Sequence, residues 1–326
     1  MVPDAALVDR FRADLDALSA SGERIGIAIS GGPDSLALLF LAAAARPGLI
    51  EAATVDHQLR AESAAEANFV ASLCQHLDVP HAILTARWEK RPTTAIQEHA
   101  REARYRLLDD WLAERKLTAL VTAHHADDQA ETMVMRLNRG AGLRGLAGMR
   151  RKAMIVGGNR PLIRPLLGWR HSELEEICAA AGVNPVNDPS NADKQFERVR
   201  VRNALKDTSW LDPGSLASSA AHLASADEAL EWMTDGLALA RVIDDADALR
   251  IDAQGLPLEL QRRLLLHAFV RFHAPEPRGA ELTRALAALS RGETASLSGL
   301  KLESGSLWRV SRAPERRKPH ADSTSA

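Results

Sequence analysis

Cysteine is scarce in this chain of 326 residues, which contains only Cys74 and Cys178. Two cysteines cannot build a disulfide framework or a four-cysteine metal site, and both lie in helix-like apolar segments where buried, inert thiols are expected. Long hydrophobic segments are also missing, because the longest uncharged apolar run, around residues 35–45, is too short to span a bilayer. Residues 1–12 contain acidic side chains and lack the apolar core of a signal peptide. These absences predict a soluble, cytoplasmic protein.

An excess of charge of one sign is absent too, since 41 Lys and Arg oppose 43 Asp and Glu and the net charge is −2. The total charge therefore does not indicate a nucleic-acid partner. Its distribution does, because residues 136–206 hold 14 Lys and Arg against 6 Asp and Glu. A basic segment inside a neutral protein is typical of a surface that contacts phosphate, although surface-loop arginines account for part of this excess.

Short apolar segments alternate with helical segments throughout the first half of the chain. The expected strands are 25–30, 49–56, 81–86 and 118–123, and the expected helices are 34–45, 62–77, 95–115 and 127–137. Strands separated by helices of this length form βαβ units and hence a parallel sheet with helices on both faces. We therefore predict an α/β domain over residues 1–210, with its ligand site at the carboxyl ends of the strands.

The rest of the chain has a different composition. Segments rich in Gly, Pro and Asn surround one expected helix, 171–181, and beyond residue 211 the chain turns to Ala- and Leu-rich helices with weak strands near 295–302 and 306–309. The length and the 46% hydrophobic content suit two packed domains. We predict a smaller, mainly helical C-terminal domain over residues 211–326, with a disordered polar tail from about residue 312 to residue 326.

A glycine-rich loop, Ser30-Gly31-Gly32-Pro33-Asp34-Ser35, follows the first expected strand. Its glycines let the backbone approach a ligand, and its proline suits the first turn of the helix that follows. The helix N-terminus and the two serine hydroxyls favour an anion. Asp34 would repel a phosphate unless a cation lay between them, which predicts Mg²⁺ bridging Asp34 and a polyphosphate. The Walker sequence is absent, which excludes a P-loop nucleotide hydrolase.

The segment 122–132, with the sequence TAHHADDQAET, ends the fourth expected strand. On a helix, Asp127 and Glu131 would lie within about 60° of His124, and Asp128 about 40° to the other side. So many carboxylates on one arc need compensating cations, either a metal ion or an ammonium group. We therefore take His124, Asp127 and Glu131 as candidate catalytic residues and Asp128 as a candidate metal ligand. The spacing of these residues is too sparse to predict a zinc site.

Three weaker patterns remain ambiguous. The literal G-x-G-x-x-G of residues 140–145 follows a helix rather than a strand, so we interpret it as a flexible basic loop with Arg139 and Arg144, not as a dinucleotide site. Asp56 and His57 end the second strand, where a hydrogen-bonded turn explains them equally well. A solvated face explains the pair of arginines at 101 and 104, three residues apart on one helix, as well as a site does.

These motifs, in their order, resemble two nested families. The loop SGGPDS is similar to the signature of the N-type ATP pyrophosphatases, or PP-loop enzymes, which cleave ATP between its α and β phosphates and adenylate an oxygen. The full set closely resembles the tRNA(Ile)-lysidine synthases over residues 24–205. It comprises SGGPDS, VDHQLR (55–60), TAHHADDQAET, RLNRGAGLRGL (136–146), RPLL (164–167), NDPSN (187–191) and RVRVR (198–202).

This resemblance implies an adenine nucleotide alpha-hydrolase-like fold and a ligase. The implied reaction joins L-lysine to C2 of the wobble cytidine in the isoleucine tRNA with a CAU anticodon, consumes ATP and releases AMP and pyrophosphate. The product, lysidine, changes codon reading from AUG to AUA and the identity of the tRNA from Met to Ile. Longer members of the family carry a further C-terminal domain, of which this chain has a short version or none.

The resemblance also implies roles for particular residues. The loop of residues 30–35 would cradle pyrophosphate with Mg²⁺ on Asp34, and Asp56 and His57 would lie at the adenine and ribose. Asp127 and Glu131 would hold lysine, one of them taking its ammonium proton, with His124 near the reacting centre. The arginines expected to bind tRNA are Arg139, Arg144, Arg198, Arg200 and Arg202.

Other functions stay open at this point. A PP-loop tRNA thiolase needs a catalytic cysteine pair or an iron–sulfur set, whereas both cysteines of this chain are isolated from its motifs. A non-catalytic nucleotide- and RNA-binding module would not need the set of His124, Asp127 and Glu131. Amidotransferase-type synthetases need an ammonia-generating domain, for which the sequence gives no sign. The sequence also leaves the oligomeric state open, a homodimer included.

Overall fold

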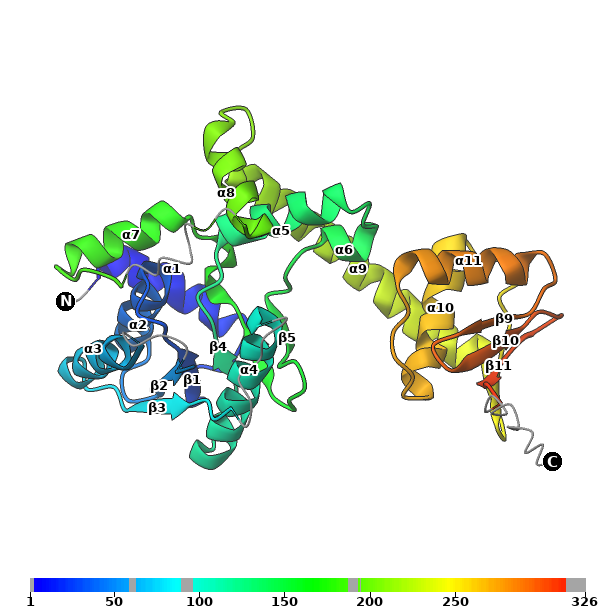
Figure 1. The fold of residues 1–326 in the computed structure, drawn as a ribbon, viewed down its shortest axis with the longest axis horizontal. Coiled ribbons are helices and arrows are strands. Elements are labelled where there is room, and N and C mark those ends of the chain that lie inside the picture. The colour runs from blue at the N-terminus through cyan, green and yellow to red at the C-terminus, as the bar shows by residue number, and fades with distance from the viewer. Residues whose placement is uncertain (1–2, 59–62, 89–95, 187–192, 194, 315–326) are drawn as a thin grey trace, which may run out of the picture. The chain divides into compact units, whose positions relative to one another are not determined.

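Two units make up the chain, an α/β unit up to Ala224 and a second unit from Ser225 (Figure 1). This computed structural model describes residues 3–58, 63–88, 96–186, 193 and 195–314. The end of the VDHQLR motif, residues 59–60, and the whole NDPSN motif, residues 187–191, lie outside the described residues, and so does the expected tail beyond Pro314. No helix in the described ranges has the length and apolar character needed to cross a membrane.

A six-stranded sheet in the order β3-β2-β1-β4-β6-β5 forms the centre of the first unit. Its strands are β1 (Ile25–Ala28), β2 (Ile50–Asp56), β3 (His81–Thr85), β4 (Leu120–Val121), β5 (Lys152–Met154) and β6 (Pro161–Ile163). All neighbours pair in parallel except β5, which is antiparallel to β6 at one edge. The chain runs outward from β1 to β2 and β3 and then returns to β4 on the other side. The carboxyl ends of β1 and β4 therefore border the point where a ligand is expected.

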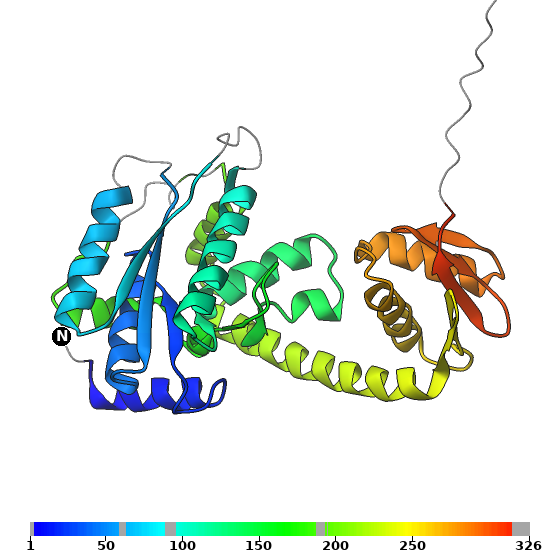
Figure 2. The same cartoon turned by 90° about the horizontal axis from the view of Figure 1, so that it is seen from below.

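Helices cover both faces of this sheet, as predicted (Figure 2). The helices on one face are α1 (Ala5–Asp16), α2 (Pro33–Ala45), α3 (Ser63–His76) and α7 (His171–Ala180), and α4 (Ile96–Arg115) packs on the other. Beyond the ends of β4 and β6 lie α5 (Ala126–Asn138), α6 (Leu143–Leu146), the 3₁₀ turn η1 (Pro165–Gly168) and α8 (Glu197–Asp207). The predicted α/β fold is thus confirmed.

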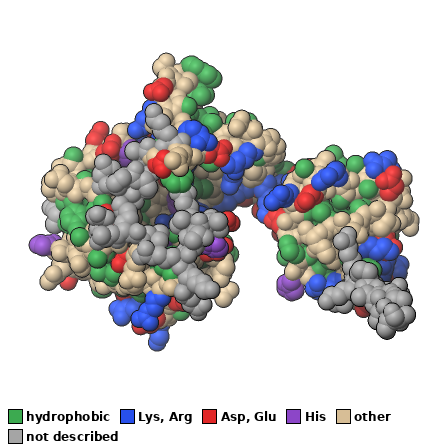
Figure 3. Space-filling view, in the orientation of Figure 1, with side chains coloured by type: hydrophobic (Ala, Val, Ile, Leu, Met, Phe, Trp, Pro, Cys, Tyr) green, Lys and Arg blue, Asp and Glu red, His purple; other side chains and the backbone are tan. Residues whose placement is uncertain are grey.

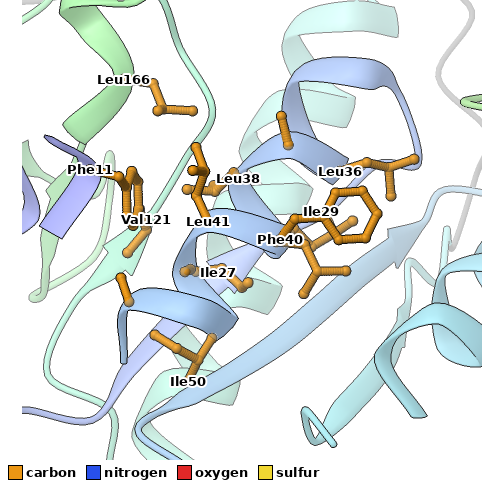
Figure 4. Close-up of a cluster of buried hydrophobic side chains, with 14 of the residues drawn as sticks. Phe11, Ile27, Ile29, Leu36, Leu38, Phe40, Leu41, Ile50, Val121 and Leu166 are labelled. Carbon is orange, nitrogen blue, oxygen red and sulfur yellow. The ribbon is translucent and has the colours of Figure 1, made fainter. Parts of the chain in front are cut away.

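Packing on the two faces fixes the strand ends that carry the motifs. Helix α2 is apolar along most of its length, and its Leu38 lies in one buried cluster with Phe11, Val121 and Leu166 from three other elements (Figure 4). On the opposite face α4 comes so close to β1 that a Cβ at Gly26 would lie 2.5 Å from side-chain carbons of α4. Only glycine fits there, because both the strand and the helix are held by the surrounding core.

The second unit begins inside the long helix α9 (Pro213–Arg241) and combines helices with an antiparallel sheet. Its sheet has the order β7-β8-β11-β10-β9, formed by β7 (Val242–Asp245), β8 (Ala248–Ile251), β9 (Ala295–Leu297), β10 (Leu300–Glu303) and β11 (Trp308–Arg312). Helices α10 (Leu258–Arg271) and α11 (Gly279–Ser290) share a core with this sheet. The helices and the weak strands near 295–302 and 306–309 are as expected, and the hairpin β7–β8 is an addition. The units divide within α9, whereas the change in composition lies near residue 210.

Candidate active site

The loop between β1 and α2 is shaped by glycine and by a serine network. Gly31 has φ +85°, and a Cβ there would lie 3.1 Å from a methyl carbon of Val186, so that glycine is required twice over. The Ser35 hydroxyl donates to the Gly32 carbonyl at 2.9 Å and accepts from the Ser30 N–H at 3.2 Å. Pro33 occupies the first turn of α2. The loop thereby holds the N-terminus of α2, whose backbone donors favour an anion.

A group of carboxylates and imidazoles lies next to this loop, and we call it the acidic side of the site. Its members are Asp34, His125, Asp127, Asp128, Glu131 and His171. An oxygen of Asp34 lies 2.7 Å from His171 Nδ1, and its other oxygen lies 3.5 Å from Nε2 of the buried His125. His125 also lies 3.6 Å from Asp127 and 3.5 Å from Asp128. Burial lowers the pKa of His125, but Asp127 and Asp34 outweigh it and raise the pKa to about 10. His125 is therefore a cation among three carboxylates.

The same contacts keep these carboxyl groups ionised. Burial raises the pKa of Asp34, but hydrogen bonds with His125 and His171 hold it well below its ordinary value. Asp127 accepts hydrogen bonds from Arg170 Nε and Nη2, at 3.2 and 3.1 Å, and from the His171 N–H at 2.8 Å. These contacts and that with His125 lower the pKa of Asp127 despite its partial burial. Hydrogen-bond donors at the start of α7 thus compensate the negative charge of Asp127 in the first turn of α5.

Glu131 is the most deeply buried carboxylate here, with an exposure of 2%. Two arginines of α8 surround it: Arg198 Nε lies 2.6 Å and Arg202 Nε 2.5 Å from its two oxygens. Arg198 also reaches Asp128, whose other oxygen accepts the N–H of His125. The predicted crowding of carboxylates is real, and arginines together with His125 compensate it.

Cationic side chains gather on the other side of the site, the arginine side, formed by Arg101, Arg104 and Arg164 with Tyr105 and His124. Tyr105 is 1% exposed, and the guanidinium carbons of Arg101 and Arg104 lie 5.0 and 5.1 Å from the centre of its ring. Its hydroxyl, Arg104 Nε and Arg164 Nε are buried without a hydrogen-bond partner in the described part of the chain. Buried donors of this kind need an acceptor. The arginine side therefore suits an anion.

His124 belongs to this side although it adjoins His125. Its Nδ1 lies 2.8 Å from the Thr122 hydroxyl. Burial, assisted by Arg164 and Arg104 and opposed by Asp128, lowers the pKa of His124 to about 3. The imidazole is neutral near pH 7, so it can orient a group by a hydrogen bond but cannot carry a proton as an imidazolium acid.

The predicted adenine and ribose residues lie at the end of β2. Asp56 accepts hydrogen bonds from the Gln58 N–H at 2.8 Å and from the Ser63 hydroxyl at 2.7 Å, which makes it part of a turn. His57 Nδ1 is buried and has no hydrogen-bond partner among the described residues. Burial and the charge of Arg104 lower the pKa of His57. His57 thus offers a neutral ring with an unused polar atom.

The arginines predicted to contact tRNA are spread over α5, α6 and α8. Arg139 pairs with Glu197, and Arg200 donates to the Gln195 carbonyl at 2.8 Å. Both arginines are exposed, and Arg144 is exposed on α6. Lys and Arg side chains gather around α5 and α6 on the face drawn in Figure 3. The other two predicted arginines, on α8, face the carboxylates described above.

Several residues of the site escaped the sequence analysis. They are His125, Tyr105, Arg164, Arg170 and His171, together with the two arginines of α4 that the sequence left ambiguous. Helix α5 begins at Ala126 with His125 as its N-cap, so His124 lies outside the helix and helical angles do not apply to it. The signals were present, because His125 adjoins His124 and because Arg170 and His171 lie three and four residues after the end of the RPLL motif.

Comparisons with known proteins identify the family of this chain. A family model described as a PP-loop domain matches residues 7–208. The chain is 50% identical over 310 residues to the tRNA(Ile)-lysidine synthase of Novosphingobium aromaticivorans, covering 94% of each chain. It is 43% identical over 298 residues to that of Zymomonas mobilis, covering 90% of each. The U34-tRNA thiolase NcsA of Methanococcus maripaludis superposes with a TM-score of 0.55 at 15% identity, over 68% of this chain and 80% of that one, which shows the fold alone.

The fold, the loop after β1 and the matching domain define a PP-loop enzyme that uses ATP. Within that class, the chain belongs to the tRNA(Ile)-lysidine synthase family, whose members are ligases that modify tRNA. The thiolase alternative loses support, because both cysteines are buried and burial raises the pKa of Cys74 to about 12 and that of Cys178 to about 11.

Proposed function

We propose that this chain joins L-lysine to C2 of the wobble cytidine in the isoleucine tRNA with a CAU anticodon, at the expense of ATP. The observation that supports this best is the pairing of an acidic side and an arginine side next to a PP-loop, at the ends of β1 and β4. The relatives named above supply the class of tRNA. We expect the reaction in the cytoplasm, where tRNA, ATP and lysine occur together.

The chemistry needs an activated base. Cytosine C2 is a poor electrophile because its oxygen O2 is a poor leaving group. In the proposed first step O2 attacks the α-phosphorus of ATP, an O–P bond forms and pyrophosphate leaves. The lysine ε-amine then attacks C2, the C–O bond breaks and AMP leaves with O2. The ammonium group must lose a proton before it attacks, and a carboxylate of the acidic side is the proposed acceptor.

The two sides match the two ends of an amino acid. Asp127 and Glu131, the proposed lysine ligands, would attract ammonium groups, whereas the α-carboxylate would fit the arginine side. Arg104 Nε and Arg164 Nε support the second part, because these buried donors have no partner among the described residues. The neutral His124 belongs to the arginine side and would orient the reacting groups through its ring nitrogens.

The arginines of α8 link tRNA to the lysine site. Arg198 and Arg202 form ion pairs with Glu131 in this structure, and both arginines are also proposed tRNA contacts. We propose that tRNA phosphates replace Glu131 as their partner, which would free this carboxylate for lysine. Arg139, Arg144 and Arg200 would bind the tRNA from the exposed surface nearby.

The loop of residues 30–35 would hold the pyrophosphate part of ATP, with Asp56 and His57 at its adenosine end. Asp34 would share a divalent cation with the polyphosphate, and Asp128, beside His125, is a second carboxylate near that position. Mg²⁺ bound there would offset the repulsion between carboxylate and phosphate.

Purified protein with ATP, lysine and a transcript of the isoleucine tRNA tests the proposed function. AMP release is measured together with incorporation of labelled lysine, and control reactions omit lysine or replace the wobble C by U. We expect both signals only in the complete mixture. AMP formed with tRNA but independently of lysine would preserve the adenylating fold and reject lysine as the nucleophile, whereas no AMP in any mixture would reject catalysis.

A further inference from the structure

Three residues of the acidic side converge in a way that the proposed ligation does not require. Asp34, His125 and His171 each direct one potential metal-ligating atom inward, and these atoms lie within 4.8 Å of one another. They come from the starts of α2, α5 and α7, which are far apart in the sequence. The imidazole rings stack with centroids 5.3 Å apart, and one nitrogen of each faces the Asp34 carboxylate.

The far side of each imidazole faces another carboxylate. His125 Nδ1 lies 3.6 Å from Asp127, and His171 Nε2 lies 3.3 Å from Glu175 one turn further along α7. A carboxylate behind the second ring nitrogen is the usual support of a histidine that binds a metal ion, because it fixes the orientation of the ring and makes the ligand more basic. Both histidines have a carboxylate on that side, at 3.3 Å for His171 and at 3.6 Å, beyond hydrogen-bond distance, for His125.

We propose that Asp34, His125 and His171 form a site for a borderline divalent transition-metal ion such as Zn²⁺ or Co²⁺. Two imidazoles and one carboxylate are ligands that such ions favour, and three protein ligands leave a position for water or a phosphate oxygen. The ion displaces the proton that His125 holds in the metal-free chain, so binding releases this proton to solvent. Mg²⁺ prefers oxygen ligands alone, so the histidines add affinity for the softer ion and little for Mg²⁺. The site takes its ion without nucleotide and competes with Mg²⁺ for Asp34. It rests on the geometry around the loop and not on which nucleophile the enzyme uses.

Titration of the metal-free, full-length chain with Co²⁺ tests this site by visible absorption, without an activity assay. We expect d–d bands from a nitrogen- and oxygen-ligated ion, their removal by Zn²⁺ and their persistence in a large excess of Mg²⁺. His171→Gln should abolish the bands. Glu175→Gln should weaken Co²⁺ binding about tenfold, as loss of a carboxylate behind a metal-bound histidine does.

Glu176→Gln is the matched control, because Glu176 is exposed on the same helix and does not face the imidazole. It should leave Co²⁺ binding unchanged. Absent bands in the unmodified chain, or equal bands in His171→Gln, would overturn the proposal and leave a hydrogen-bonded network without metal. If near-ultraviolet circular dichroism shows that His171→Gln does not fold, the Co²⁺ affinities of Glu175→Gln and Glu176→Gln test the site instead. Equal affinities of these two variants would also overturn the proposal.

Discussion

His124 and His125 are neighbours in the chain, yet their surroundings drive their pKa values apart, to about 3 and about 10. The backbone at His125 is extended, so successive side chains point to opposite sides. One ring enters the arginine side and the other enters the acidic side. The charge of each imidazole is therefore set by residues from other elements and not by the local sequence.

The two sides also differ in how many of their polar groups already have ion-pair or hydrogen-bond partners. On the acidic side the carboxylates of Asp127 and Glu131 already have arginine partners. On the arginine side two buried guanidinium nitrogens and the Tyr105 hydroxyl lack partners in the described residues. An anion can thus join the arginine side at once, whereas an ammonium group must replace a cation on the acidic side. This asymmetry makes separate effects expected from variants of each side.

Removing the charge of Asp34 from the acidic side should have the largest effect on the rate of AMP formation. Asp34→Asn removes the charge that meets both His125 and His171, so we expect AMP formation to fall by at least about 100-fold, as for loss of a preorganised electrostatic group. The control is Asp110→Asn, at an exposed position of α4. Near-normal turnover in Asp34→Asn would reject the proposed role of the loop.

Removing a charge from the arginine side should raise the KM for lysine and leave the KM for ATP nearly unchanged. Arg104→Met removes a buried charged donor, so we expect the KM for lysine to rise about 10- to 100-fold, equivalent to one charge-assisted hydrogen bond. The KM for ATP should change little, and the exposed Arg106→Met on the same helix serves as the control.

Cadaverine, which is lysine without its carboxylate, sharpens this test. The unmodified enzyme should prefer lysine strongly, and Arg104→Met should lose most of that preference. If Arg104→Met raises the KM for ATP instead, the arginine side holds the nucleotide and not the amino acid.

A variant of the buried carboxylate should have a smaller effect, because its present partners compete with the ligand. Glu131→Gln should raise the KM for lysine about tenfold and that for ATP less, since one charged hydrogen bond is lost and Arg198 and Arg202 are released. Steady-state kinetics with each substrate varied in turn measures the difference, and Asp127→Asn should behave alike. An unchanged KM for lysine in both variants would reject these residues as lysine ligands.

The sequence predicted the fold well, because its apolar strands and amphipathic helices alternate with clear boundaries. It did not predict α8, whose only buried side chains are Val199 and Leu205. This helix depends on tertiary contacts, since its arginines pair with Glu131 on α5. Strands β5 and β6 were missed as well, because three-residue segments carry too little pattern.

The sequence predicted several residues of the candidate site but not which side chains pair with them in the folded chain. The loop of residues 30–35 and the acidic residues of α5 stand in recognisable motifs. The partners of those residues do not, because Arg170 lies 43 residues from Asp127 in the chain and His171 lies 137 residues from Asp34. Local spacing showed that cations were needed, and only the folded chain shows which side chains supply them.

Titration of the two neighbouring histidines should give the smallest effects and is the most direct test of the comparison. In the metal-free folded protein His125 should keep its proton up to about pH 10, and His124 should remain neutral down to about pH 3. Nuclear magnetic resonance of ¹³C-labelled histidine follows both rings, with His124→Gln and His125→Gln for assignment. Equal titration of the two rings near their ordinary value of about 6.5 would contradict the division into two sides.

The same shifts act on stability with opposite signs. The pKa of His125 is raised on folding, so its stabilisation is present below about pH 6.5 and disappears as the pH rises toward 10. The pKa of His124 is lowered, so the unfolded chain binds the extra proton and stability falls as the pH drops from about 6.5 toward 3. His125→Gln should therefore flatten the alkaline limb of the melting temperature and His124→Gln the acid limb. An exchange of these two effects would mean that the rings occupy each other's side.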